Sequence, residues 1–151
     1  MSATTCLCAH TVRKIIGIAM VAAALIGVGG IPIARAQDQA HAKVLGVWEG
    51  TLTFGPTVPT VMEFTQHGDA ITWTCSYRES SDVLWGDVEG TVTSFSPPNL
   101  EATGVYTKHA VSRMAGTGVK LSLTLDGDHM KGTLTAEINN LPIEVSLNRK
   151  K

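Results

Sequence analysis

From Lys43 onward, apolar and polar residues alternate with a period of two, and this pattern constrains the fold more than any other feature of the chain. Successive side chains of a β-strand point to opposite faces, so the alternation is typical of strands with one buried face. The clearest example is Ala70–Tyr77, where Ile71, Trp73, Cys75 and Tyr77 alternate with threonine and serine. Eight strands are expected in all, over Val44–Phe54, Thr60–Gln66, Ala70–Tyr77, Val83–Ser94, Glu101–Thr107, Val119–Leu125, Met130–Ile138 and Ile143–Asn148.

One of these segments is less regular than the others. Val83–Ser94 sets Leu84, Val88 and Val92 on one side, whereas Glu101–Thr107 has no clear apolar side. No segment after Lys43 has the 3.6-residue periodicity of an amphipathic helix. The sequence therefore predicts an all-β domain.

The segments between the expected strands are short and rich in turn-forming residues. His67-Gly68-Asp69 and Asp126-Gly127-Asp128-His129 contain residues that tolerate the positive φ of tight hairpins, and Asn139-Asn140-Leu141-Pro142 is a similar turn. The longest connection, Lys108–Gly118, is a candidate lid. Consecutive hairpins with one apolar face predict an eight-stranded antiparallel up-and-down barrel, because closure removes the two unpaired edges of a meander. A two-sheet β-sandwich is the alternative.

The N-terminal segment has the pattern of a secretory signal peptide. A leader ending in Arg13-Lys14 precedes the apolar run Ile15–Ile33, and Ala34-Arg35-Ala36 then offers small residues to a signal peptidase. We therefore expect a signal peptide at residues 1–36, a disordered lead-in at 37–42 and a β-barrel domain at 43–151. The protein is expected to be secreted or periplasmic, without stable insertion in the membrane after cleavage.

Charge and cysteine content narrow the classes of function. The whole chain has a formal net charge of −1, and three of its basic residues lie in the expected signal peptide, so the remaining domain is more acidic. A nucleic-acid partner is not expected, because such a surface requires clustered basic residues. Cys6 and Cys8 would leave with the signal peptide, so Cys75 has no cysteine partner within the mature chain and the fold depends on its own core.

The start and the end of the domain resemble the lipocalins and the wider calycin group. Gly46-Val47-Trp48 opens the first strand, and Arg149 shares the parity of Val145 and Leu147 in the last strand. In lipocalins the Gly-x-Trp tryptophan closes one end of the barrel and an arginine from the last strand stacks across it. The resemblance implies that Gly46, Trp48 and Arg149 close the barrel in the same way. The chain lacks the Thr-Asp-Tyr turn and the terminal helix of lipocalins, and an avidin-like barrel fits the same layout.

The sequence contains little evidence for a catalytic site or a metal site. The histidines after residue 36 have no i, i+2 or i, i+4 pairing on a shared face, so no metal site or cofactor is expected. Asp87 and Glu89 share a polar face with threonines, which indicates a solvated exterior, and no G-x-S-x-G motif is present. Cys75 lies on an apolar face, where a cysteine usually acts as a small buried hydrophobe. We therefore expect no enzymatic activity.

The side chains that are expected to face the barrel interior remain as the candidate ligand site. An eight-stranded barrel is wide enough either to fill with side chains or to hold one small ligand. We expect an exported binding module for a small apolar or amphipathic molecule, and the alternative is a structural or interaction protein with a solid core. The expected ligand-binding residues are Met62, Phe64, Trp73, Cys75, Tyr77, Leu84 and Leu123, and a possible basic mouth is formed by Lys108, His109 and Arg113.

Overall fold

The structure is a computed structural model, and it describes residues 41–78 and 84–151. The expected signal peptide at 1–36 lies outside the described residues. His41 and Ala42, the last two residues of the expected lead-in, form part of a helical turn, and the Val44 N–H donates to the His41 carbonyl at 2.9 Å. Val44 is fully buried, so the packed domain already includes the residues just before the first strand.

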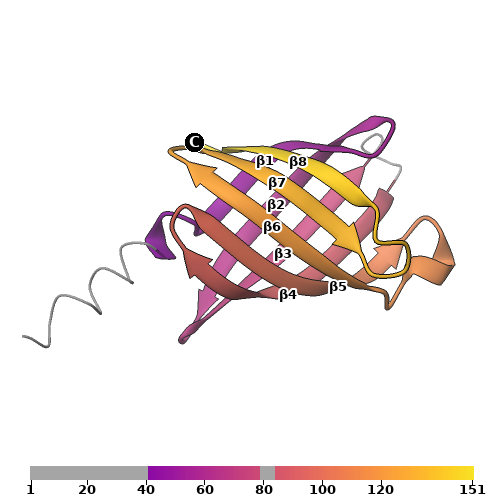
Figure 1. The fold of residues 1–151 in the computed structure, drawn as a ribbon, viewed down its shortest axis with the longest axis horizontal. Coiled ribbons are helices and arrows are strands. Elements are labelled where there is room, and N and C mark those ends of the chain that lie inside the picture. The colour runs from indigo at the N-terminus through magenta and orange to yellow at the C-terminus, as the bar shows by residue number, and fades with distance from the viewer. Residues whose placement is uncertain (1–40, 79–83) are drawn as a thin grey trace, which may run out of the picture. The chain divides into compact units, whose positions relative to one another are not determined.

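Eight strands form a closed antiparallel barrel in which each strand pairs with its neighbours in the chain (Figure 1). The strands are β1 (Gly46–Thr53), β2 (Thr57–His67), β3 (Ala70–Arg78), β4 (Leu84–Ser96), β5 (Asn99–His109), β6 (Gly118–Asp126), β7 (His129–Ala136) and β8 (Pro142–Arg149). A 3₁₀ turn, η1 (Ser112–Met114), lies between β5 and β6. β1 also pairs with β8, which closes the barrel. The predicted eight-stranded up-and-down barrel is confirmed, and the sandwich alternative is excluded.

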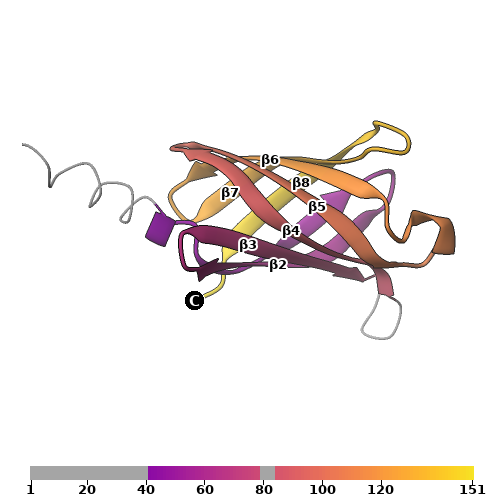
Figure 2. The ribbon, with the colours of Figure 1, turned by 90° about the horizontal axis from the view of Figure 1, so that it is seen from below.

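The barrel has two different ends, which Figures 1 and 2 show from two sides. At one end lie the hairpins β2–β3, β4–β5 and β6–β7 together with the C-terminal residue. We call this the closed end, because Trp48 and Arg149 cover it. The other end carries the β1–β2 hairpin, the loop 110–117 with η1, and the β7–β8 loop at 137–141. We call it the open end, because it contains the cavity described below.

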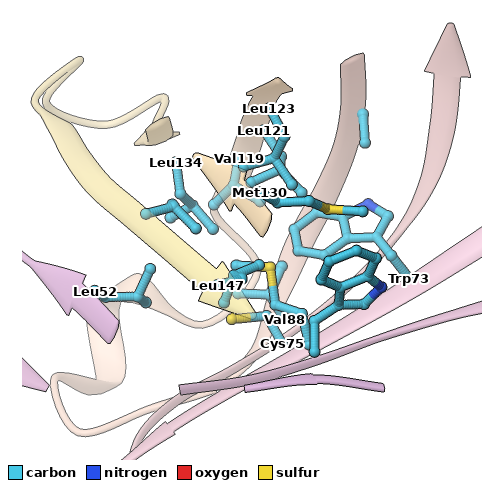
Figure 3. Close-up of a cluster of buried hydrophobic side chains, with 14 of the residues drawn as sticks. Leu52, Trp73, Cys75, Val88, Val119, Leu121, Leu123, Met130, Leu134 and Leu147 are labelled. Atoms are coloured by element: carbon cyan, nitrogen blue, oxygen red, sulfur yellow. The ribbon is translucent and has the colours of Figure 1, made fainter. Parts of the chain in front are cut away.

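The alternation seen in the sequence separates the core from the surface. In β3, Ile71, Trp73, Cys75 and Tyr77 are 1–4% exposed, whereas the residues between them face outward. Inward residues of all eight strands form one apolar cluster, and Figure 3 shows Trp73 from β3, Met130 from β7 and Leu147 from β8 within it. Thr60 is the buried polar residue among those described, and its hydroxyl donates to the Ser76 carbonyl at 3.1 Å.

The structure of β5 differs from what the sequence of Glu101–Thr107 indicated, namely a strand without a clear apolar side. Its inward face is well defined, because Leu100, Ala102 and Tyr106 are 1–3% exposed. The alternation was hidden because Leu100 lay outside the expected segment and because two of the inward residues, Ala102 and Gly104, are small. The small residues leave room for a neighbouring ring: a Cβ on Gly104 would lie 3.0 Å from Cζ2 of Trp73.

Candidate functional site

The closed end is built around the indole of Trp48. Trp48 and Arg149 are register partners in β1 and β8, and the guanidinium carbon of Arg149 lies 4.3 Å from the centroid of the Trp48 ring. The Trp48 Nε1–H donates to the Val44 carbonyl at 2.8 Å. The geometry that the resemblance implied for these two residues is therefore present.

Arg149 also holds the chain that enters β1. Its guanidinium donates to the carbonyl of Leu45 at 2.8 Å and to that of Lys43, and its Nε lies 3.3 Å from a carboxylate oxygen of Asp128. Gly46 has a φ of 111°, which favours glycine at this point. A Cβ on Gly46 would lie 3.6 Å from the guanidinium. Gly46, Trp48 and Arg149 thus form one structural unit that covers this end.

Most of the expected ligand-binding residues lie in the buried core in the middle of the barrel. Met62, Phe64, Trp73, Cys75 and Leu123 are at most 3% exposed and do not line the open-end cavity. Their side chains belong to one cluster of buried apolar residues contributed by all eight strands, which is typical of an eight-stranded barrel filled by its own side chains. Of the seven expected residues, Tyr77 alone lines the cavity.

Leu84 also lies outside the cavity, and a β-bulge explains its position. The β3–β4 register shifts at Tyr77/Arg78, so that Gly86 pairs with Tyr77 and Leu84 pairs with Arg78. A bulge adds a residue on one strand and redirects the side chains beside it. As a result Leu84 is half-buried outside the cavity, and Trp85, which strict alternation would turn outward, lies in the cavity wall.

Cys75 is inert in this environment. It is 1% exposed, its Sγ lies 3.3 Å from the Thr60 hydroxyl, and burial raises its pKa from 9.0 to about 12. The thiolate is the nucleophilic form of cysteine, so a buried thiol with a raised pKa is a poor nucleophile. Cys75 therefore acts as a core residue.

A cavity of about 660 Å³ occupies the open end of the barrel. Its floor contains the buried side chains of Tyr77, Tyr106 and Ala136. Aromatic contacts build one wall: the ring centroids of Phe54 and Trp85 are 5.3 Å apart, and those of Phe54 and Tyr77 are 6.3 Å apart. The remaining lining comes from the ends of β1, β5 and β8, from the β1–β2 hairpin, and from the loops 110–117 and 137–141. It comprises Thr53, Gly55, His109, Val111, Arg113, Met114, Asn139, Leu141, Pro142, Ile143 and Glu144.

The expected basic mouth is only partly present. His109 and Arg113 line the cavity, but Lys108 is on the outer face, where its ammonium lies 4.0 Å from Asp87 and its side chain is 72% exposed. Lys108 and His109 are consecutive residues of β5 and therefore point to opposite faces. The loop that was expected as a lid contains η1, and backbone bonds from Ala110 N to Trp85 O and from Gly116 N to Tyr106 O tie it to β4 and β5.

The charge environment of the cavity favours neutral groups. Burial raises the pKa of both Tyr77 and Tyr106, and a hydrogen bond with Tyr106 raises that of Tyr77 further. Burial also lowers the pKa of His109. Both kinds of shift have the same cause, since a partly dry cavity disfavours the charged form of any group.

Sequence reasoning missed most of the cavity lining, although two signals were present. Phe54 shares the parity of Trp48 and Leu52, and its place at the end of the first expected strand puts it at a barrel rim. Asn139, Leu141 and Pro142 lie in an expected turn next to an inward strand. Trp85 had no such signal, because its direction depends on the bulge.

Comparisons with protein-family models and with curated proteins found no match to this chain. In residues 41–78 and 84–151, no group of three or more histidine, cysteine or acidic side chains is placed to hold a metal ion. The same part of the chain contains no helix that is long and apolar enough to cross a membrane. The candidate site is therefore defined by the geometry of the barrel.

Proposed function

We propose that this protein is an exported, non-enzymatic binding module that holds a small apolar or amphipathic molecule at the open end of its barrel. The observation that carries the proposal is the cavity of about 660 Å³ with its aromatic wall. Small-molecule sites in proteins are usually concave, have volumes of roughly 300–1,000 Å³ and combine an apolar lining with a few polar groups. The open-end cavity fits this description, whereas the inward side chains in the middle of the barrel belong to the buried core.

The closed end supports the lipocalin-like part of the proposal. A Gly-x-Trp strand whose tryptophan is covered by an arginine from the last strand is the feature that the sequence shares with lipocalins. Placing the chain with the lipocalins or the wider calycin group remains part of the proposal. Calycin-type barrels bind many chemically different ligands, so the fold alone does not identify the ligand.

Binding is tested with the uncharged fluorescent probe N-phenyl-1-naphthylamine. We expect saturable enhancement of the probe signal together with a change in tryptophan emission, because Trp85 lines the cavity whereas Trp48 and Trp73 are 0–1% exposed in the core. In Trp85→Phe the probe should still bind, since the ring is kept, while most of the change in tryptophan emission disappears. The absence of a saturable response across a panel of lipophilic probes would favour the alternative, a structural or interaction protein with no small-molecule ligand.

Export is tested by the mass of the mature protein. When the full chain is expressed in a secreting host, the exported protein is expected to begin at Gln37, after the Ala34-Arg35-Ala36 sequence. Intact-mass measurement of the exported fraction checks this directly. Exported protein that retains residues 1–36, or a chain that stays in the cytoplasm, would contradict it.

A further inference from the structure

The polar groups of the open-end cavity are unevenly distributed between its floor and its rim. Arg113 and Glu144, which have opposite charges, belong to exposed residues at the rim. The floor instead contains the side chains of two tyrosines, Tyr77 and Tyr106, which line the cavity and are 1–2% exposed. The His109 ring lies beside them, with its centroid 5.0 Å from that of Tyr106 and an interplanar angle of 85°. Polar recognition deep in the cavity is therefore available from neutral side chains.

These neutral groups present hydrogen-bond donors. Each tyrosine hydroxyl has one proton to donate as well as lone pairs, so both Tyr77 and Tyr106 can hydrogen-bond a neutral polar group. Nδ1 of His109 accepts the Val111 N–H at 3.0 Å, which places the proton of the neutral ring on Nε2. A ligand that places a hydrogen-bond acceptor at the floor can therefore be bound by neutral donors.

A charged ligand end would be poorly stabilised at this depth. Lys108 is directed away to Asp87. Among the described residues that line the cavity, the one cationic side chain is that of Arg113, which is at the rim with Glu144 as an opposing charge. Moving an ionised group into a partly dry site without a counter-charge costs several kcal/mol or more, whereas a neutral acceptor there gains a hydrogen bond. A pure hydrocarbon, in turn, would leave a buried donor without an acceptor.

We infer that the cavity selects an amphipathic molecule with an uncharged, hydrogen-bond-accepting polar end, such as a long-chain alcohol or ester. The polar end lies at the Tyr77 and Tyr106 hydroxyls, and the apolar body lies against Phe54, Trp85 and Met114. This inference rests on the proposed function and adds the chemical class of the ligand to it.

The test compares ligands with the same alkyl chain and different ends. 1-Dodecanol, methyl dodecanoate, dodecanoate and dodecyltrimethylammonium compete with bound N-phenyl-1-naphthylamine at pH 8, each below its critical micelle concentration. We expect the alcohol and the ester to displace the probe at concentrations at least about tenfold lower than either ion, because only the ions must bury a charge. Equal or tighter binding of either ion overturns the inference and leaves the proposed function in place. Failure of the probe itself to bind would instead remove the proposed function.

Matched variants separate the floor from the rim. Tyr106→Phe and Tyr77→Phe retain the ring and remove one hydroxyl each, so each should weaken dodecanol binding about fivefold, the equivalent of one hydrogen bond. Arg113→Gln should leave the ratio of dodecanol to dodecanoate affinity unchanged. A loss of dodecanoate binding in Arg113→Gln, with no effect of the tyrosine variants on dodecanol, would assign head-group recognition to the rim and overturn the inference. Circular dichroism of each variant verifies that the barrel is folded.

Discussion

Arg149→Ala is expected to lower the free energy of unfolding by about 3 kcal/mol, because charged hydrogen bonds contribute about 1.5–3 kcal/mol each and a cation–π contact about 0.5–2 kcal/mol. The substitution removes the stacking on Trp48, two hydrogen bonds to backbone carbonyls and the contact with Asp128. Arg149→Lys should cost nearly as much, since an ammonium group has neither the planar face nor the forked donors of a guanidinium. Urea denaturation of the three proteins measures the difference.

The neighbouring Lys150 provides the control. Its ammonium lies 2.6 Å from Glu49, but both side chains are about half exposed, and exposed ion pairs typically contribute 0–1 kcal/mol. Lys150→Ala should therefore change stability little. A double-mutant cycle of Trp48→Leu and Arg149→Ala measures the coupling, which we expect to be about 1 kcal/mol or more. Coupling near zero would mean that the stacking does not stabilise the closed end, and would remove the main residue-level support for the lipocalin resemblance.

Gly90→Ala is expected to destabilise the barrel by about 3 kcal/mol, the upper part of the usual range for an overpacked core. Gly90 faces Gly104 across the β4–β5 pair, and Trp73 lies over them with its Nε1–H donating to the Thr103 carbonyl at 3.1 Å. A Cβ on Gly90 would lie 2.1 Å from that carbonyl oxygen and 2.5 Å from Nε1 of Trp73. Neither the strand backbone nor the buried indole can move away cheaply.

Gly118→Ala is the matched control, because Gly118 also lies in a strand and also has no positive φ. Its Cβ would meet the Glu137 carboxylate at 2.3 Å, which is the far end of a flexible, exposed side chain. A surface change of this kind should alter the free energy of unfolding by no more than about 0.5 kcal/mol. Urea denaturation and near-ultraviolet circular dichroism, which reports the packing of Trp73, compare the two variants. Equal stability of Gly90→Ala and Gly118→Ala would show that Trp73 is not held against the glycines.

The alternation of apolar and polar residues, together with the turn residues, was sufficient to predict much of the fold. The alternation in Ala70–Tyr77 and Val119–Leu125 specified strands and their inward faces, because a period of two puts every apolar residue on one side whatever the rest of the chain does. The parity of Trp48 and Arg149 placed both side chains on the same surface of the sheet. The turn residues Gly68 and Gly127 adopt positive φ, as their hairpins require.

The position of the cavity was decided by the tertiary structure. Parity assigns a side chain to the interior of the barrel, but not to a height along its axis. Among the described residues, inward side chains near the middle belong to the buried core, and the cavity with the aromatic wall lies at the open end. The direction of Trp85 depends on how β3 and β4 pair around the bulge, which is a property of two strands together. The role of Gly90 and Gly104 likewise requires Trp73 from another strand. By itself the sequence determined the strands and, in regular strands such as β3 and β6, the residues that face inward. Only the closed barrel decided the directions of Leu84 and Trp85, which inward residues pack against one another, and which surround the open cavity.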